Sequence, residues 1–313
     1  DFEGNYWFTS YRKGLLFLEQ SKFQNLTMKY GIDSSIVNCV MKYNDSLVIG
    51  TDEGLYIVGS NGKLVMAKDN ELLVKLSGIS IRDLYIDSSG KLWIATYKIY
   101  GVIRVEPNWK YKLFNRSESS LVSNSVNCIT EMGTGDIAVG TENGVSVIRG
   151  DEVIRSFSRS DGFDTPDIIS LFYTDDGELY AGSNGAGIYI IDQNYAVRRM
   201  IMDDSQKMSV VSSIIKGSNG IWIGTDNGLY YREGTVRQIN TVDSTNSIYD
   251  MILDNKGYLW VFGSRGIYRY NEKDILSSAE PECTTYTKND GLVSGITEKS
   301  TNYISESGVI YVC

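Results

Sequence analysis

The sequence predicts an all-β fold, a seven-bladed β-propeller of four-stranded antiparallel blades, on three observations. A short phrase recurs along the chain: a turn with Asp and Gly, then Trp, Ile or Val, Gly, Thr, polar residues and another Gly. Its copies are 38 to 51 residues apart, which is the length of one propeller blade. Stretches with helical periodicity are almost absent, and 31 Gly with 3 Pro suit many tight turns.

The Trp position of the phrase marks each copy along the chain. It is occupied by Trp7, Val48, Trp93, Ala138, Tyr180, Trp222, Trp260 and Tyr311. A single blade cannot bury both of its faces, so the blades must stack around an axis and close into a ring. The chain starts at a second strand and ends after a first strand, so C-terminal residues are expected to supply the inner strand beside Trp7. Seven blades follow, with eight as the alternative.

Each unit is expected to contain four strands in chain order. Ile81 to Ile86 predicts a first strand, and Asp87 to Gly90 predicts a hairpin turn in which Asp bonds the backbone ahead. The Trp-bearing strand follows, and its aromatic ring is expected to fill the space between blades. The Gly of that strand is expected to let a neighbouring backbone approach. A third strand such as Gly144 to Val147 and a less regular fourth strand complete the unit.

Charge and composition exclude several classes of function. A net charge of -9, without a cluster of Lys or Arg, argues against nucleic acid or an anionic membrane surface as a partner. The chain has no histidine, which excludes a Ser/His/Asp triad and removes the commonest metal ligand. The DxxG turns are too short for calcium loops. We therefore expect no catalytic residue, no metal and no cofactor in this chain.

The clearest copies of the phrase carry a family resemblance. They lie at Asp87 to Thr96, Gly220 to Tyr231 and Asp254 to Tyr270, with partial copies at Asp1 to Phe17 and Asp45 to Tyr56. In these copies the chain resembles the two-component regulator propeller repeat, whose pattern is DxxGxLWIGTxxGL. Val48 and Ala138 depart from the Trp of that pattern without breaking the period.

The resemblance implies that residues 1–313 form a single β-propeller sensor domain of a longer, membrane-bound signalling protein. It implies a location on the periplasmic or extracellular face of the bacterial cytoplasmic membrane and a small-molecule or oligosaccharide ligand. The implied output domain is a GGDEF diguanylate cyclase or a histidine kinase. Because both outputs work as dimers, a homodimer is expected, with the membrane reached only through segments outside this chain.

Polar residues follow the first aliphatic residue of the expected inner strands in two adjacent rows. The first row contains Asn38, Arg82, Asn127, Ser212 and Tyr249, and the second contains Asp83, Ser170, Ser213 and Asp250. Side chains alternate along a strand, so one row faces the central channel. These residues either solvate the channel or bind a ligand, and the candidate ligand-binding residues among them are Asn38, Arg82, Asp83, Asn127, Tyr249 and Asp250.

The links between second and third strands are expected to emerge on the rim of the channel. The link with Tyr97, Lys98 and Tyr100 is two residues longer than others and places two aromatic rings and a cation on an exposed loop. Arg12 and Arg265 are further candidates from other links. Aromatic rings beside hydrogen-bonding groups suit a sugar ring, and ordinary surface variation is the alternative.

Two other functional classes stay open beside the sensor. A propeller glycosidase or lyase needs two positioned carboxyl groups, one with a raised pKa, and Asp83 and Asp250 are the conceivable pair. A scaffold propeller for protein partners would expose an apolar patch, of which the charge-rich links give little sign. The resemblance and the missing histidines favour a sensor without enzymatic activity.

Overall fold

The computed structural model describes residues 6–10, 14–18, 23–32, 36–200, 208–241, 247–292 and 294–313. For residues 6–10 and 14–18 and for Ala67, the description is limited to the backbone. Arg12, a candidate from the sequence, lies outside the described residues.

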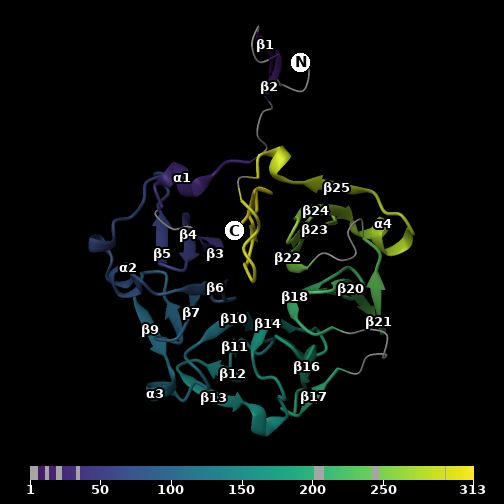
Figure 1. The fold of residues 1–313 in the computed structure, drawn as a ribbon. Helices are drawn as coiled ribbons and strands as arrows, with labels where there is room; N and C mark the ends of the chain where they lie inside the picture. The colour runs from purple at the N-terminus through teal and green to yellow at the C-terminus, as the bar shows by residue number, and fades with distance from the viewer. Residues whose placement is uncertain are drawn as a thin grey trace.

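Six antiparallel sheets stand around a central axis, each with its first strand nearest the centre (Figure 1). The first blade contains β3 (Val37–Tyr43), β4 (Ser46–Thr51) and β5 (Gly54–Val58). The second contains β6 (Ile81–Ile86), β7 (Leu92–Thr96), β8 (Val102–Val105) and β9 (Tyr111–Phe114). The third contains β10 (Val126–Glu131), β11 (Ile137–Thr141), β12 (Gly144–Arg149) and β13 (Glu152–Phe157). In the first blade, a bridge between Val58 and Leu64 stands where the other blades have a fourth strand.

The fourth to sixth blades repeat the same order. The fourth contains β14 (Ile168–Tyr173), β15 (Leu179–Ser183), β16 (Ile188–Ile191) and β17 (Val197–Arg199). The fifth contains β18 (Val211–Lys216), β19 (Ile221–Thr225), β20 (Gly228–Glu233) and β21 (Thr235–Ile239). The sixth contains β22 (Ile248–Leu253), β23 (Tyr258–Gly263), β24 (Gly266–Asn271) and β25 (Cys283–Tyr286).

Short elements fill the connections and both ends of the chain. The hairpins are β1 (Tyr6–Ser10) with β2 (Gly14–Leu18) and β26 (Tyr303–Ile304) with β27 (Ile310–Tyr311), and the helices are α1 (Leu26–Tyr30), α2 (Glu71–Leu76), α3 (Arg116–Ser119) and α4 (Glu272–Ser277). Single 3-10 turns cover Ala67–Asp69, Arg159–Asp161 and Lys288–Asp290. Within the described ranges, no helix has the length and apolar character needed to cross a membrane.

The prediction of seven blades, with eight as the alternative, is wrong, because the described residues form six. The six central copies of the phrase do lie in second strands of blades, from Val48 in β4 to Trp260 in β23. The first copy lies in β1, which pairs with β2, and the last lies in β27, which pairs with β26. Among the described residues, these two hairpins remain separate two-stranded sheets, and no C-terminal strand pairs beside Trp7.

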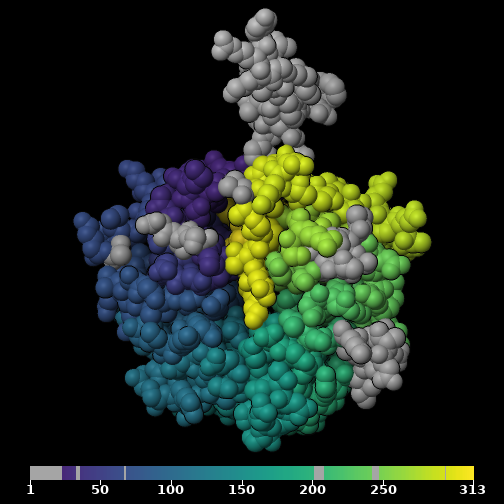
Figure 2. Space-filling model, viewed as in Figure 1, coloured from purple at the N-terminus to yellow at the C-terminus, as the bar shows by residue number. Residues whose placement is uncertain are grey.

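The C-terminal hairpin lies between the first and the sixth blade and reaches the centre of the ring (Figures 1 and 2). Tyr303 and Tyr311 pack against the first blade's apolar cluster, which includes Val40 and Ile49. Ile310 and Val312 join the cluster around Phe262 of the sixth blade. The hairpin therefore acts as an apolar wedge that connects the two ends of the ring.

The Asp and the Trp of the phrase form one hydrogen-bonded unit. Asp87 Oδ1 accepts from the backbone N–H groups of Ser89 and Lys91, both at 2.9 Å, and Oδ2 accepts from the indole of Trp93 at 2.8 Å. Asp254 binds Trp260 in the same way at 2.9 Å. Burial opposes ionisation, yet the hydrogen bonds from Ser89 and Trp93 hold the pKa of Asp87 below its usual value.

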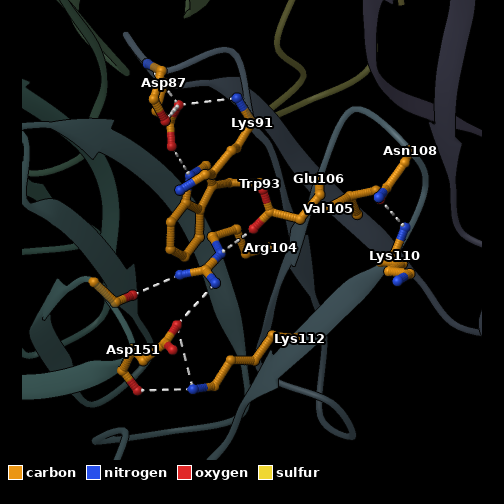
Figure 3. Close-up of polar contacts among 12 residues, drawn as sticks. Asp87, Lys91, Trp93, Arg104, Val105, Glu106, Asn108, Lys110, Lys112 and Asp151 are labelled. Carbon is orange, nitrogen blue, oxygen red and sulfur yellow. Dashed lines mark hydrogen bonds and ion pairs between the residues drawn. The ribbon is translucent and has the colours of Figure 1, made fainter.

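Neighbouring blades also meet through an outer contact over that unit (Figure 3). Arg104 of β8 lies 5.9 Å from the ring centroid of Trp93 and binds Glu106 at 3.1 Å. It reaches the third blade through Asp151 at 2.8 Å. The indole is thus covered by a cation that also connects two blades.

The Thr and the Gly of the phrase have separate structural roles. Thr141 Oγ1 donates to the carbonyl of Gly144 and closes the link between second and third strands, and Thr51, Thr96 and Thr225 make the equivalent bond. A Cβ on Gly140 would lie 2.5 Å from Cys128 Sγ and 3.0 Å from Ile168 Cγ2 of the next blade. The glycine leaves the space into which the next blade packs, as the sequence predicted.

Gly140→Ala should destabilise the fold by about 1 to 3 kcal/mol, because the added methyl group overpacks the junction between the third and fourth blades. Urea unfolding followed by tryptophan fluorescence measures the change. Gly295→Ala is the matched control, since a Cβ there meets no atom within 4 Å. Equal stability of the two variants would contradict the role of Gly140 in leaving space for the next blade.

Candidate functional site

The first polar row of the sequence coincides with a β-bulge in every inner strand. The pairing register between first and second strands shifts between residues 37 and 39, 81 and 83, 126 and 128, 168 and 170, 211 and 213, and 248 and 250. The bulged positions are therefore Asn38, Arg82, Asn127, Ile169, Ser212 and Tyr249. A bulged residue is unpaired in the ladder and its side chain is redirected, which frees it for contacts outside its own sheet.

Three of the bulged side chains join one blade to the next. Asn38 Nδ2 donates to the carbonyl of Ile81 at 2.9 Å, and Asn127 Nδ2 donates to the carbonyl of Ile168, also at 2.9 Å. Ser212 Oγ donates to the carbonyl of Ile248. Each bond satisfies a backbone acceptor at the start of the next inner strand, so these residues stabilise the ring itself.

Arg82 departs from this pattern and turns toward the rim. Its guanidinium lies 4.9 Å from the ring centroid of Tyr97, and its Nη1 lies 3.8 Å from Asp52 Oδ1. The Nε atom is buried and has no hydrogen-bond partner within the described part of the chain, while the side chain as a whole is 32% exposed. Arg82 therefore has one buried donor without a partner, while the exposed part of its guanidinium lies beside Tyr97 and Asp52.

The loop between β7 and β8 brings Tyr97, Lys98 and Tyr100 to the same place. Tyr97 and Tyr100 are half-buried, and Lys98 is exposed with a left-handed backbone at φ 78°. Lys98 Nζ lies 5.2 Å from the Tyr97 ring centroid, and Lys75 Nζ from α2 lies 4.7 Å from that of Tyr100. One loop thus carries two aromatic rings, each beside at least one cation. We name these residues the rim patch: Lys75, Arg82, Tyr97, Lys98 and Tyr100.

Asp83 and Asp250 of the second row lie in the hub and bind other parts of the chain. Asp83 Oδ2 accepts from the Ile129 N–H at 2.9 Å, and its Oδ1 accepts from the Thr301 hydroxyl at 3.1 Å. Asp250 Oδ2 accepts from the backbone and side-chain N–H groups of Asn302, at 2.8 and 3.0 Å. Burial raises the pKa of Asp83 to about 7 and that of Asp250 to about 6.

The remaining candidates are dispersed. Tyr249 packs in the apolar cluster of the sixth blade, and burial raises the pKa of its hydroxyl. Arg265 is exposed in the link between β23 and β24. The structure thus brings Arg82 together with Tyr97, Lys98 and Tyr100, and places Asn38, Asn127, Asp83 and Asp250 in contacts that hold the ring and the C-terminal segment.

Sequence reasoning missed one member of the rim patch. Lys75 belongs to α2, which begins after the N-cap residue Asn70 and buries Leu72, Leu73 and Leu76. An Asn followed by apolar residues at helical spacing is a signal for such a helix. The same signal would have placed Lys75 on this helix, but not its contact with Tyr100.

A separate cleft of about 630 Å³ opens at the junction between the first blade and the C-terminal hairpin. Its lining is largely apolar and includes Leu26, Val40, Ile49, Ile310 and Val312. Lys29, Lys42 and Asp45 are the charged residues among its lining. No described candidate residue from the sequence lines this cleft, so it is distinct from the rim patch.

Comparisons with known proteins agree with the predicted resemblance. Residues 75–98, which include most of the rim patch, match the family model of the two component regulator propeller. The chain is similar over 100% of its length to the extracellular domain of BT3049, a protein assigned to the hybrid two component systems of B. thetaiotaomicron, with 20% identity, a TM-score of 0.79 and 43% of that chain covered. No curated protein matches the sequence.

Two further solved structures share the architecture. The extracellular domain of BT4673 from B. thetaiotaomicron is similar over 100% of this chain and 48% of its own, with 16% identity and a TM-score of 0.58. A catalytically inactive virginiamycin B lyase from Staphylococcus aureus, solved with Quinupristin, is similar over 85% of this chain and 89% of its own, with 14% identity and a TM-score of 0.66.

The chain is similar to these proteins in its fold and in one repeat. The fold is that of a β-propeller, shared at low sequence identity with the extracellular domain of BT3049 and with a virginiamycin B lyase. The second blade then carries a recognisable two component regulator propeller repeat, which confirms the resemblance predicted from the sequence. The chain spans less than half the length of the two extracellular domains that it matches.

The stability of the fold should increase as the pH falls from 8 to 5. The folded-state pKa of Asp83 lies above its ordinary value of 3.8, so this group contributes stability that is complete below pH 3.8 and is lost as the pH rises through about 7. Asp250 acts in the same direction around pH 6. Urea unfolding should show a gain of about 2 to 4 kcal/mol between pH 8 and pH 5.

Asp83→Asn should reduce that gain by about half or more, because an amide does not titrate. Asp136→Asn is the control: the hydrogen bond from Arg149 lowers the pKa of Asp136, so it titrates below this range and its variant should keep the wild-type slope. A wild-type stability that stays constant or falls between pH 8 and 5 would contradict the assignment.

Proposed function

We propose that this chain is an extracellular, ligand-binding sensor domain of a signalling protein and that it has no catalytic activity of its own. One observation carries the proposal: the fold of the whole chain is similar to that of an extracellular domain of a two component system. The match of the second blade to the regulator repeat supports it. Fold alone does not determine function, so the proposal also needs a site with free binding capacity.

The rim patch supplies such a site and supports a saccharide or another small polar molecule as the ligand. Tyr97 and Tyr100 offer ring faces, which suit the apolar face of a sugar. Lys98 and Lys75 lie over these rings, and lysine side chains on flexible stems can move aside when a ligand stacks. The guanidinium of Arg82, whose side chain is 32% exposed, then donates to a ligand oxygen.

Signal output and assembly belong to the proposal as well. By the same resemblance, the chain lies on the periplasmic or extracellular face of a bacterial cytoplasmic membrane, and binding is transmitted to a GGDEF diguanylate cyclase or a histidine kinase. We propose a homodimer as the transmitting unit, since both outputs act as dimers. Membrane contact is assigned to segments outside this chain, and nucleic acid is not a proposed partner.

The enzymatic alternative has less support. The lyase that shares the fold is inactive in a variant with one histidine replaced by alanine, and the present chain contains no histidine. The two hub carboxyl groups have raised pKa values, as a glycosidase acid requires, but Asp83 is only 7% exposed. Their oxygens already accept bonds from Ile129, Thr301 and Asn302, so substrate access would require these contacts to break.

Calorimetric titration of the chain with mono- and oligosaccharides and amino acids tests the proposal. At least one compound should bind, and Tyr97→Ala should weaken its affinity about threefold to tenfold through loss of a stacking ring. Arg82→Gln should weaken it about tenfold or more, because a bond from a charged donor is lost.

Tyr258→Ala is the matched control for the aromatic variant. Tyr258 also lies under an arginine, with Arg269 at 4.9 Å from its ring centroid, but it begins β23 at the end of the blade opposite to the rim. Affinity should be unchanged in this control. Failure of every compound to bind, or equal loss in Tyr97→Ala and Tyr258→Ala, would refute the rim patch as the ligand site.

A further inference from the structure

The hub of this propeller holds a segment of its own chain through two carboxyl groups. We propose that residues 301–305, together with β27, form a latch that Asp83 and Asp250 hold in the hub, and that protonation of these two aspartates tightens the latch while their ionisation loosens it. This conformational device goes beyond the sensor proposal and does not depend on any ligand.

The contacts of the segment show that the two aspartates dominate its polar attachment. The Thr301 N–H donates to the Asn38 carbonyl at 2.8 Å, and Thr301 forms a parallel bridge with Cys39 of the first blade. The Thr301 hydroxyl binds Asp83 of the second blade, and Asn302 binds Asp250 of the sixth blade through two N–H groups. Two adjacent residues thus connect three blades.

The rest of the segment depends on this anchor. Asn302 Oδ1 accepts from the Cys313 N–H at 2.9 Å, and the Thr297 N–H donates to the Cys313 carbonyl at 3.1 Å. The strand pair β26 and β27 has only two register pairs, Tyr303 with Tyr311 and Ile304 with Ile310. A hairpin this short is not stable by itself, so it remains in place only while the hub and the apolar clusters hold it.

Among the described residues, no cation is one of the groups that most strongly shift the pKa of Asp83 or Asp250. Asp83 interacts electrostatically with Asp250, with Cys39 of β3 and with Cys128 of β10. Tyr85 of β6 also interacts with Asp83, and Cys313 interacts with Asp250. Arg82, the adjacent cation, contacts Tyr97 and Asp52, and its charge also acts on Cys39 in the hub. Ionisation of both aspartates therefore places two like charges in a region of low dielectric constant.

The direction of the effect follows from linkage between proton binding and release of the segment. In the latched state burial raises the pKa of Asp83 to about 7 and that of Asp250 to about 6, and this outweighs the hydrogen bonds from Thr301 and Asn302, which lower the two pKa values. In the released state water reaches both groups, and their pKa values return toward the ordinary value. The latched state therefore binds protons more tightly, and a pH rise through 6 to 7 shifts the equilibrium toward release.

Hydrogen exchange measured by mass spectrometry on the whole chain tests the latch. After correction for intrinsic exchange rates, the protection of peptides covering residues 297–313 should fall by about tenfold or more between pH 5.5 and pH 8. Peptides from β11 and β15, in the centres of two blades, should lose less protection. Equal loss in the segment and in the blades, or constant protection of the segment, would overturn the proposal.

Two variants separate the latch from general stability. Asp83→Asn keeps the shape of the side chain, its amide can donate to the Thr301 hydroxyl, and the pH response of residues 297–313 should shrink severalfold. Asp151→Asn is the control, because Asp151 is exposed at the outer contact with Arg104 and should leave the response unchanged. If Asp83→Asn does not fold, Thr301→Val removes the hydroxyl donor alone and should lower the protection of the segment at pH 5.5. Unchanged protection in Thr301→Val would count against the latch.

Discussion

The packing of each inner strand against the next is the constraint on which this ring depends. Six sheets converge on one axis, where backbone carbonyls at the strand starts would lose water without a partner. The bulge solves this problem, because it redirects a side chain such as Asn38 or Asn127 onto the carbonyl of the following strand. The glycine opposite, as at Gly140, provides the space for that approach.

The sequence predicted the repeat and its internal design but not the number of blades. The phrase predicts a second strand, its turn and its link. Contacts between residues close in sequence form each of these, such as the bond between Asp254 and Trp260. A blade requires in addition that two to three further strands pair with it, and those pairings are long-range. Trp7 and Tyr311 carry the local features of a strand without such neighbours, so counting the phrase overestimated the ring.

Prediction of the site succeeded in part for a similar reason. Alternation along the inner strands identified the two polar rows, and the long link pointed to Tyr97, Lys98 and Tyr100. What alternation cannot show is the partner of each side chain. Asn38 and Arg82 occupy the same bulged position in consecutive blades, yet one binds the next blade and the other turns to Tyr97. The two blades differ in the link between their second and third strands: the second blade has Tyr97 there, and the first has Asp52 and Glu53.

The polar residues of the hub and those of the rim patch therefore differ in the partners that they already have. Asp83 and Asp250 have accepted hydrogen bonds from the C-terminal segment and from Ile129, so a ligand in the hub would have to replace bonds that are already made. Arg82 Nε has no hydrogen-bond partner within the described residues, and a ligand that stacks at the rim displaces the lysines over Tyr97 and Tyr100 rather than the bonds of the hub. The energetic difference favours ligand binding at the rim and a structural, proton-sensitive role for the hub.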